Sequence, residues 1–287
     1  MHQQQIISCF NDCGSLQIVA NASKVKPKKD NTILNISNHQ GIVEYRPEEL
    51  VITVKSGTTL QEINHILYQN QQMLAFEPVD FGNSTIGGTV AMAISGQRSA
   101  YLGGIRDFVL GMEIINGKGQ YCRFGGKVMK NVAGFDFARL LTGSQGKLAV
   151  IMQISLKVLP LVKDEKSFQI KAQTNEVLDI LAHLDQLNLS GVIYQDNILS
   201  YRLKGKNTLA ANEITNDFWQ TLNLPYFSND AFAQMVDKFS EITSDTLILD
   251  LGGYRRWHKQ YIANKKSNVE ALIDKIKLAF DPNSIFV

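Results

Sequence analysis

The chain has 287 residues, 44% of them hydrophobic and 20% charged, which is typical of a globular protein large enough for two lobes with separate cores. Its 29 Lys and Arg residues and 27 Asp and Glu residues leave a net charge of +2, which gives no electrostatic argument for nucleic-acid binding. No apolar run approaches the roughly 20 residues that span a membrane. The polar N-terminus lacks the apolar core of a signal peptide, so we expect a cytoplasmic protein.

The first half of the chain predicts a mixture of strands and helices. Residues 50–54 are rich in β-branched side chains and predict a strand. Thr59 and Glu62 form a capping box, which predicts the start of a helix. Residues 108–124 predict a hairpin around an Asn-Gly turn, and residues 148–159 predict a long apolar strand.

After residue 163 a different order of elements begins. The patterns predict a strand, a helix, a two-stranded hairpin, a second helix and a strand, at 168–172, 177–184, 192–195 with 198–203, 232–239 and 247–251. This β-α-β-β-α-β order is typical of a ferredoxin-like sandwich. A last helix is predicted from the capping box of Ser267 and Glu270 to Asp281-Pro282, and we expect it to pack back onto the first lobe.

The three cysteines, Cys9, Cys13 and Cys122, have neither the number nor the spacing of a disulfide framework or a metal cluster. We expect reduced thiols. The sequence therefore predicts no metal site in this chain, and any iron–sulfur chemistry would belong to a partner.

Glycine is concentrated in one stretch, since 14 of the 21 glycines lie between residues 82 and 146. Glycine costs about 0.5–1 kcal/mol in a regular element, so this density indicates either many tight turns or a backbone that approaches a ligand closely. Three glycine-rich loops follow one another, at 82–89, 104–111 and 125–148. The first can direct several backbone N–H groups at a diphosphate, or it can be turn chemistry alone. The Arg106-Asp107 pair of the second is equally consistent with a structural ion pair.

In this order, the three loops resemble the FAD-binding domain of the vanillyl-alcohol-oxidase (PCMH) type. Within that superfamily the chain is similar to the E-subunit family of glycolate oxidase. The segments that carry this similarity are 124–134, 139–144, 155–160, 252–257 and 280–286. The resemblance implies an α+β fold with a PCMH-type FAD-binding domain at 1–163, a smaller ferredoxin-like lobe at 164–251, and a C-terminal segment, 252–287, that returns to the FAD domain.

The resemblance also implies FAD as the cofactor. We expect it to be non-covalent, because no histidine lies in the first loop or just before Arg106-Asp107, where covalent flavin links often form. The loop at 82–89 would hold the diphosphate, and the later loops would line the flavin and ribityl pocket. The residues implied to contact FAD are Ser23, Gly82, Asn83, Ser84, Thr85, Ile86, Gly87, Gly88, Thr89, Asp107, Val109, Gly111, Ala133, Gly134, Gly143, Ser144, Gly146 and Ile151.

Two features depart from the family pattern. The family's first diphosphate loop has the form Gly-Gly-Gly-Ser-Lys, whereas this chain has Ala20-Asn21-Ala22-Ser23-Lys24. If this loop adopts left-handed backbone angles, alanine there carries a strain of about 1–3 kcal/mol. The family also continues past the final Phe with Asn-Pro-Gly-Arg, so we expect a shorter C-terminal contact with the first lobe.

Catalytic side chains stay unassigned. The histidines at positions 2, 39, 65, 183 and 258 are isolated, unlike the His-rich segment of the members that oxidise 2-hydroxy acids. Arg255, Arg256 and His258 are candidates for binding a substrate carboxylate or the flavin edge. A solvated or subunit-facing basic pair is the alternative.

The resemblance therefore implies the FAD-binding subunit of a complex that oxidises glycolate, a small 2-hydroxy acid, to glyoxylate, with the flavin carrying the electrons. The expected partners are a D-type flavoprotein subunit and an iron–sulfur subunit, and any membrane association would come through the complex. One alternative is a non-catalytic structural or assembly subunit with a weakened or lost FAD site. Another is an autonomous oxidase of a related hydroxy acid, or an enzyme that reduces a cell-wall nucleotide-sugar precursor.

Overall fold

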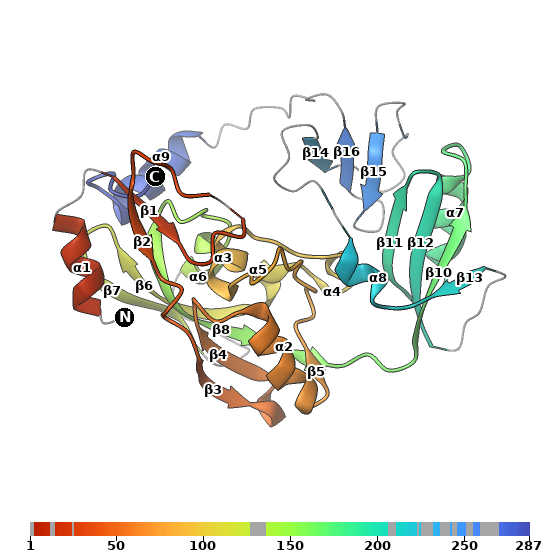
Figure 1. Cartoon of the computed structure of the whole chain (residues 1–287), viewed down its shortest axis with the longest axis horizontal. Coiled ribbons are helices and arrows are strands. Elements are labelled where there is room, and N and C mark those ends of the chain that lie inside the picture. The colour runs from red at the N-terminus through yellow and green to blue at the C-terminus, as the bar shows by residue number, and fades with distance from the viewer. Residues whose placement is uncertain are drawn as a thin grey trace. The chain divides into compact units, whose positions relative to one another are not determined.

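The computed structural model describes most of the chain, and its contacts divide the chain into two compact units (Figure 1). Unit 1 comprises Met1–Ile94, Gly104–Pro160 and Ser267–Val287, and unit 2 comprises Ser95–Gly103 and Leu161–Lys266. The contacts thus group 95–103 with unit 2, whereas the boundaries proposed from the sequence stay a prediction. The described residues are 3–11, 15–24, 26–126, 136–205, 211–222, 224, 232–235, 242, 246–250, 255–258 and 270–287.

An antiparallel five-stranded sheet organises unit 1. Its order is β3-β4-β8-β6-β7, with bounds Ile42–Arg46, Val51–Lys55, Ala149–Lys157, Val109–Asn116 and Tyr121–Gly125. The strands expected at 50–54, within 108–124 and at 148–159 are confirmed. β8 lies in the middle of the sheet and is buried along almost its whole length, which explains its continuous apolar sequence.

The helix that follows β4 begins where its capping box predicts. Thr59 is the N-cap of α2 (Leu60–Gln69), and its hydroxyl accepts a hydrogen bond from the Glu62 backbone N–H at 3.1 Å. Leu60, Ile63 and Leu67 form its buried face. The shorter elements of unit 1 are α1 (Gln3–Asn11), η1 (Pro47–Glu49), β5 (Gln72–Met73), α3 (Ile86–Ala91), α5 (Ile105–Phe108), α6 (Phe137–Leu141) and β9 (Leu159–Pro160).

A second layer of unit 1 joins the two ends of the chain. β1 (Leu16–Val19) pairs in parallel with β2 (Thr32–Asn35), and the C-terminal residues extend this layer. The backbone N–H of Leu16 donates to the carbonyl of Ile285 at 2.6 Å. α9 (Glu270–Phe280) is the last helix, and its contacts group it with unit 1. Ser267 of its predicted cap lies outside the described residues.

Unit 2 is built on a seven-stranded sheet of order β13-β10-β12-β11-β15-β16-β14. The expected hairpin is confirmed: β11 and β12 turn at Asp196 and Asn197, which both have positive φ, as a tight hairpin turn requires. The elements of unit 2 are α4 (Ser99–Leu102), β10 (Glu165–Lys171), α7 (Val177–Leu184), β11 (Leu189–Gln195), β12 (Ile198–Lys204), β13 (Asn212–Ile214), α8 (Phe218–Thr221), β14 (Phe232–Met235), β15 (Thr246–Asp250) and β16 (Arg255–His258).

One predicted element of unit 2 is wrong. Residues 232–239 were expected to form a helix, but Phe232–Met235 form β14, and 236–239 lie outside the described residues. The apolar spacing of this segment suits a helix, but its backbone pairs antiparallel with β16, so long-range pairing overrides the local pattern. The β-α-β-β part of the expected order is present from β10 to β12.

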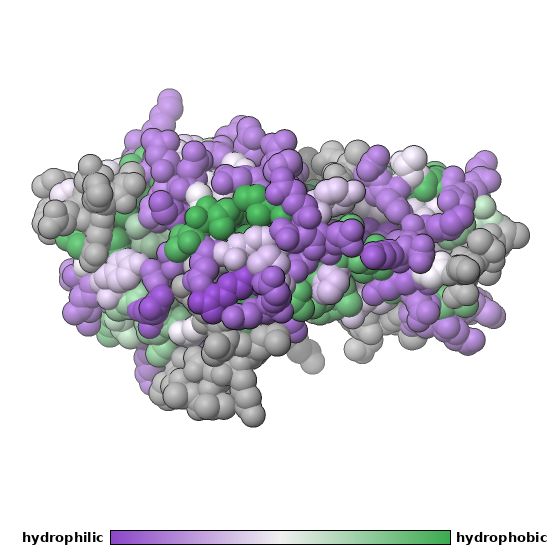
Figure 2. Space-filling model, turned by 90° about the horizontal axis from the view of Figure 1, so that it is seen from below, coloured by the Kyte–Doolittle hydropathy of each residue, from purple (hydrophilic) through white to green (hydrophobic). Residues whose placement is uncertain are grey.

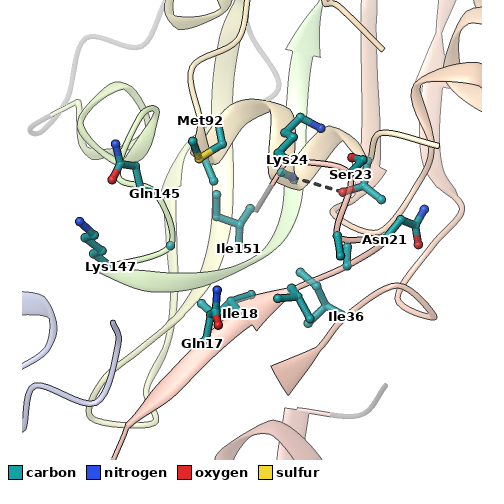
Figure 3. Close-up of a pocket in the computed structure, with 18 of the residues that line it drawn as sticks. Gln17, Ile18, Asn21, Ser23, Lys24, Ile36, Met92, Gln145, Lys147 and Ile151 are labelled. Atoms are coloured by element: carbon teal, nitrogen blue, oxygen red, sulfur yellow. Dashed lines mark hydrogen bonds between the residues drawn. The ribbon is translucent and has the colours of Figure 1, made fainter. Parts of the chain in front are cut away.

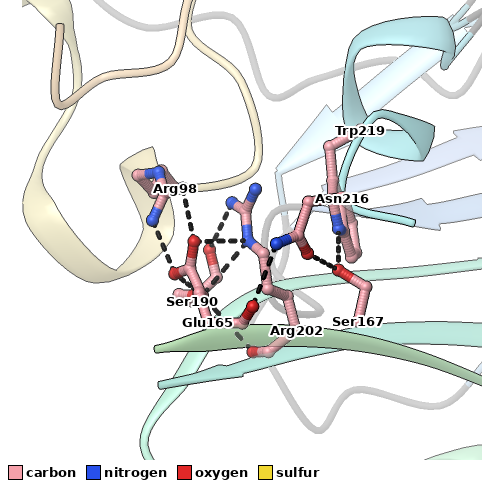
Figure 4. Close-up of polar contacts among 7 residues, drawn as sticks. All are labelled: Arg98, Glu165, Ser167, Ser190, Arg202, Asn216 and Trp219. Carbon is pink, nitrogen blue, oxygen red and sulfur yellow. Dashed lines mark hydrogen bonds and ion pairs between the residues drawn. The ribbon is translucent and has the colours of Figure 1, made fainter. Parts of the chain in front are cut away.

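A buried polar network fastens the segment 95–103 to the sheet of unit 2 (Figure 4). The guanidinium of Arg98 donates two hydrogen bonds of 2.7 Å to the two carboxylate oxygens of Glu165. Ser190 Oγ donates to the same carboxylate at 2.5 Å, and Arg202 Nε lies 3.7 Å from it. Arg202 also stacks over the ring of Trp219, with its Cζ 4.8 Å from the centroid.

The network lowers the pKa of Glu165. Burial alone would raise the pKa of this carboxyl, but the Arg98 hydrogen bonds, the charges of Arg202 and Arg98, and the Ser190 hydrogen bond bring it below its ordinary value. Glu165 is therefore an anion whose burial is compensated on several sides.

No helix within the described ranges is long and apolar enough to span a membrane. Figure 2 shows a face on which hydrophilic residues predominate and hydrophobic residues gather in a limited band.

Candidate functional site

Unit 1 contains an open pocket with about 1100 Å³ of empty space, part of it continuous with solvent. Three separate parts of the chain line it: β1 with the loop that follows, helix α3, and the loop that leads into β8 (Figure 3). Clefts lined by mostly apolar side chains with a few polar groups are typical binding sites of cofactors and other small molecules.

The pocket is apolar in its middle and polar at its two ends. Ile18, Ile36, Met92 and Ile151 line the middle. Figure 3 shows these side chains between a group formed by Asn21, Ser23 and Lys24 on one side and a group formed by Gln17, Gln145 and Lys147 on the other. Such a lining suits an elongated ligand that carries both flat apolar rings and charged groups.

The formal side-chain charge of the pocket is positive. Lys24, Lys28 and Lys147 are among its lining residues, and within the described part of the chain no aspartate or glutamate lines it. Lys24 is half-buried, whereas the other two lysines are exposed. Burial lowers the pKa of Lys24 to about 8, while the charge of Asp80 acts in the opposite direction.

The loop at 82–89 forms one wall, but its N–H groups are used differently from the expectation. Several were expected to point into the concavity. Instead, the N–H groups of Ile86 and Gly87 donate to the carbonyls of Thr58 and Ser56, and that of Gly88 donates to the hydroxyl of Thr85, the N-cap of α3. The expectation is wrong for these groups, because those of Ile86 and Gly87 join α3 to the segment after β4 and that of Gly88 belongs to the N-cap of the helix. From this loop Thr85, Gly87 and Gly88 line the pocket.

The remaining residues of that loop support its shape. Gly82 and Asn83 have positive φ and form the turn. Ser84 is fully buried; its N–H donates to Asp80 and its hydroxyl accepts from the Phe81 N–H. Ile86 and Thr89 are buried as well. These residues lie beside the pocket wall and not on its surface.

The loop at 20–24 forms the opposite wall and contacts the loop at 82–89. The side-chain amide of Asn21 donates to the carbonyl of Asn83 at 2.8 Å, and the hydroxyls of Ser23 and Ser84 are 3.3 Å apart. No described residue accepts a hydrogen bond from the backbone N–H groups of Ala22 and Ser23. These two N–H groups are therefore available for a ligand.

Ala22, which stands where the family pattern has glycine, adopts the left-handed conformation with φ of 51°. Replacing Ala22 by glycine is expected to stabilise the protein by up to about 1 kcal/mol, because glycine removes the steric cost of left-handed backbone at this position. Urea unfolding measures the change. Ala20→Gly in the same loop is the control: Ala20 has no positive φ, so the added flexibility should destabilise the protein by about 0.5–1 kcal/mol. Equal effects of the two substitutions would contradict the strain at Ala22.

The loop at 143–146 completes the pocket and depends on glycine. Gly143 and Gly146 have φ of 89° and 77°, in the region that favours glycine. The N–H groups of Gly143 and Gln145 donate to the carbonyls of Val90 and Ala91, so this loop is fastened to α3. The hydroxyl of Ser144 is buried without a hydrogen-bond partner among the described residues.

Several residues implied by the resemblance lie elsewhere in the structure. Asp107 is exposed and accepts a hydrogen bond from the Gly104 N–H at the start of α5. Val109 is buried at the start of β6, and a Cβ on Gly111 would lie 2.6 Å from the carbonyl oxygen of Gly126, so Gly111 permits a close backbone approach. Of the predicted contacts, those that line the pocket are Ser23, Thr85, Gly87, Gly88, Gly146 and Ile151.

The other predicted site residues are not among the described residues that line the pocket. Ala133 and Gly134 lie outside the described residues. Arg255, Arg256 and His258 form part of β16 in unit 2, between β15 and β14. Their role stays a prediction.

Sequence reasoning missed most of the apolar lining and the second polar end. Lys28 lies in a visible basic stretch between Lys24 and Lys29, which is the one signal that was available. Ile18, Ile36 and Met92 look like ordinary core residues in the sequence, because only the folded chain brings these distant segments together.

Comparisons with known proteins show the family of the chain. A family described as an FAD-binding domain matches residues 13–125. The glycolate oxidase subunit GlcE of Escherichia coli (strain K12) is 38% identical over 277 residues, which cover 89% of this chain and 79% of that protein. The chain belongs to the GlcE family. Its cofactor is FAD.

Two other known proteins are similar to part of the GlcE-family chain or to its fold. The glycolate oxidase subunit GlcD of Bacillus subtilis (strain 168) is 30% identical over 161 residues, covering 54% of this chain and 34% of that protein. A solved structure of alkyldihydroxyacetonephosphate synthase aligns with a TM-score of 0.71 at 13% identity, covering 99% of this chain and 73% of that one. This likeness concerns the fold alone, and it confirms the predicted α+β fold of the PCMH type.

Proposed function

We propose that the pocket of unit 1 holds the FAD of this chain. The observation that carries the proposal is the combination of an apolar middle with lysines as the only formally charged side chains among the described lining residues. The adenosine diphosphate half of FAD has matching chemistry, with a flat ring system beside two phosphates.

The described residues have distinct roles in this proposal. The diphosphate is held by Lys24, Ser23 and the N–H groups of the 20–24 loop. Water is excluded from the adenine ring by Ile18, Met92 and Ile151. When bound, FAD supplies the hydride and electron chemistry. We propose that FAD is bound non-covalently, because no histidine lies in the loop at 82–89 or just before Arg106-Asp107, where covalent flavin links often form.

The finer activity is inferred from the relatives. We propose that the chain is the FAD-binding subunit of a complex that oxidises glycolate to glyoxylate, together with a D-type flavoprotein and an iron–sulfur subunit. The similarity to GlcE and GlcD, which are both glycolate oxidase subunits, supports glycolate oxidase as the assembly. Arg255, Arg256 and His258 are the proposed contacts to substrate or to the flavin edge.

The visible absorption spectrum of the purified full chain, before and after acid precipitation, tests the cofactor proposal. Flavin bands that move to the supernatant are expected. Mixing the chain with its D-type and iron–sulfur partners should then give glycolate-dependent reduction of an artificial electron acceptor, and omitting the chain should abolish it. A chain that stays colourless when FAD is added would overturn the proposal for this pocket.

The second candidate is a structural subunit with a weakened FAD site, and the left-handed Ala22 favours it. Strain in the loop at 20–24 would lower the affinity for FAD without altering the fold. The Ala22→Gly variant separates the two functions. Flavin binding and activity that both improve in this variant would support a strained but working site, whereas complex activity that is independent of flavin on this chain would support the structural role.

A further inference from the structure

Lys24 differs from the other two lysines of the pocket in its surroundings. It is half-buried, and its Nζ lies 5.9 Å from the ring centroid of Phe81. A Cβ placed on Gly88 would be 3.7 Å from the same Nζ, so the ammonium lies against the start of α3. Lys24 thus presents its charge inside the wall of the pocket.

No carboxylate of the described residues lies within ion-pairing distance of this ammonium. Phe81 and the start of α3 lie beside Lys24, and Asp80 is the acidic residue whose charge acts on it. The other charged side chains that line the same pocket, within the described residues, are those of Lys28 and Lys147. The Asp80 carboxylate already accepts a hydrogen bond from the Ser84 N–H at 2.9 Å. Asp80 therefore attracts the Lys24 ammonium through its charge, without a direct ion pair.

A half-buried ammonium without a paired carboxylate is costly to keep charged, because burial removes its hydration. This is the cause of the lowered pKa of Lys24, at about 8. A phosphate oxygen beside Nζ would reverse the effect, since an adjacent anion favours the protonated lysine.

We propose that FAD binding in this pocket is linked to proton uptake by Lys24. In the flavin-free chain part of the Lys24 population is the neutral amine, and binding of the FAD diphosphate draws one proton from solvent onto Nζ to form the ammonium. The inference rests on the proposed FAD site of unit 1 and adds a regulatory property to it. Alkaline conditions then favour release of the flavin, and neutral conditions favour its retention.

The size of the effect follows from the fraction of protonated Lys24. With a pKa of about 8, that fraction falls from roughly 90% at pH 7 to roughly 10% at pH 9, so the Kd for FAD should rise about tenfold over this range. Near pH 8, binding should take up about half a proton per FAD.

Calorimetric titration of the flavin-free full chain with FAD, in two buffers that differ in ionisation enthalpy, measures this proton uptake. Lys24→Arg keeps a positive charge at every pH of the experiment, so it should bind FAD with no proton uptake and a flat pH profile. Lys24→Met should bind more weakly at pH 7 and also show no uptake. Lys147→Met is the matched control, because it removes an exposed lysine from the same pocket and should leave the uptake intact.

The outcomes separate this inference from the proposal on which it rests. FAD binding with no proton uptake and a flat Kd between pH 7 and 9 would overturn the inference and leave the FAD site standing. Uptake that persists in Lys24→Arg would assign the proton to another group and overturn it as well. Absence of FAD binding by the unmodified chain at every pH would overturn the FAD site itself, and the linkage with it.

Discussion

Replacing Glu165 by glutamine is expected to lower the free energy of unfolding by about 3–5 kcal/mol, because it removes the anion that compensates two buried guanidinium groups. The side chains of Glu165, Arg98 and Arg202 are only 7%, 9% and 3% exposed. Glutamine fills the same volume, but its amide N–H₂ would face the N–H donors of Arg98 where a carboxylate oxygen now accepts. Urea unfolding followed by circular dichroism measures the loss.

The matched control is Glu213→Gln in the same unit. Glu213 pairs with Lys166 at 3.0 Å, but both side chains are about half exposed, at 54% and 46%. Exposed pairs contribute about 0–1 kcal/mol, so this variant should unfold almost as the unmodified chain does. Similar losses in the two variants would contradict a special role for the buried carboxylate.

The same network makes a prediction about pH. The folded-state pKa of Glu165 is lowered, so its charged contacts stabilise the fold fully above the unfolded-state pKa of a glutamate, and this contribution is lost as pH falls through the folded value. The stability difference between the unmodified chain and Glu165→Gln should therefore be largest near neutral pH and shrink in acid. A difference that stays constant down to the acid transition would show that packing, and not charge, is responsible.

Replacing Gly87 by alanine is expected to cost about 1–3 kcal/mol and to weaken FAD binding about tenfold or more. A Cβ on Gly87 would lie 2.6 Å from the Cβ of Ser56 and 2.7 Å from its carbonyl oxygen, closer than packed atoms approach. The hydrogen bond from the Gly87 N–H to that carbonyl, 2.8 Å long, holds the first turn of α3 in place. The methyl group must push α3 away, and α3 carries one wall of the pocket.

Gly88→Ala is the matched control one residue further along. The nearest atom to its Cβ would be the hydroxyl oxygen of Thr85 at 3.3 Å, which needs to shift by only a few tenths of an ångström, and alanine has the higher helix propensity. We expect its stability to change by less than about 1 kcal/mol. Thermal unfolding and FAD titration of the pair test the argument, and a Gly87→Ala chain as stable and as tight in binding as Gly88→Ala would refute it.

The alanine-containing first loop and the buried lysine describe the same wall of the FAD pocket. Ala22 bends left-handed where the family pattern has glycine, and two residues later Lys24 enters the pocket wall. Strain at Ala22 and the cost of charging Lys24 are both expected to weaken FAD binding at this wall. FAD affinity in this chain is thus expected to depend on features of one short loop.

The sequence by itself determined the elements whose signals are local. The capping box of Thr59 and Glu62 predicted the start of α2, and two strand-like runs on either side of Asp196-Asn197 predicted the β11–β12 hairpin. These signals are local because capping and turns involve residues only a few positions apart. The glycine-rich loops, in their order, also carried the family resemblance, because backbone that approaches a cofactor closely leaves no room for side chains.

Only the tertiary structure decided which of these loops share a pocket and what else lines it. Ile18, Met92 and Ile151 meet in space although they are far apart in the chain, and Arg98 meets Glu165 across 67 positions. The pairing of β14 with β16 similarly overrode a helical pattern. No local period encodes such contacts, because they are selected by the packing of whole strands and helices against one another.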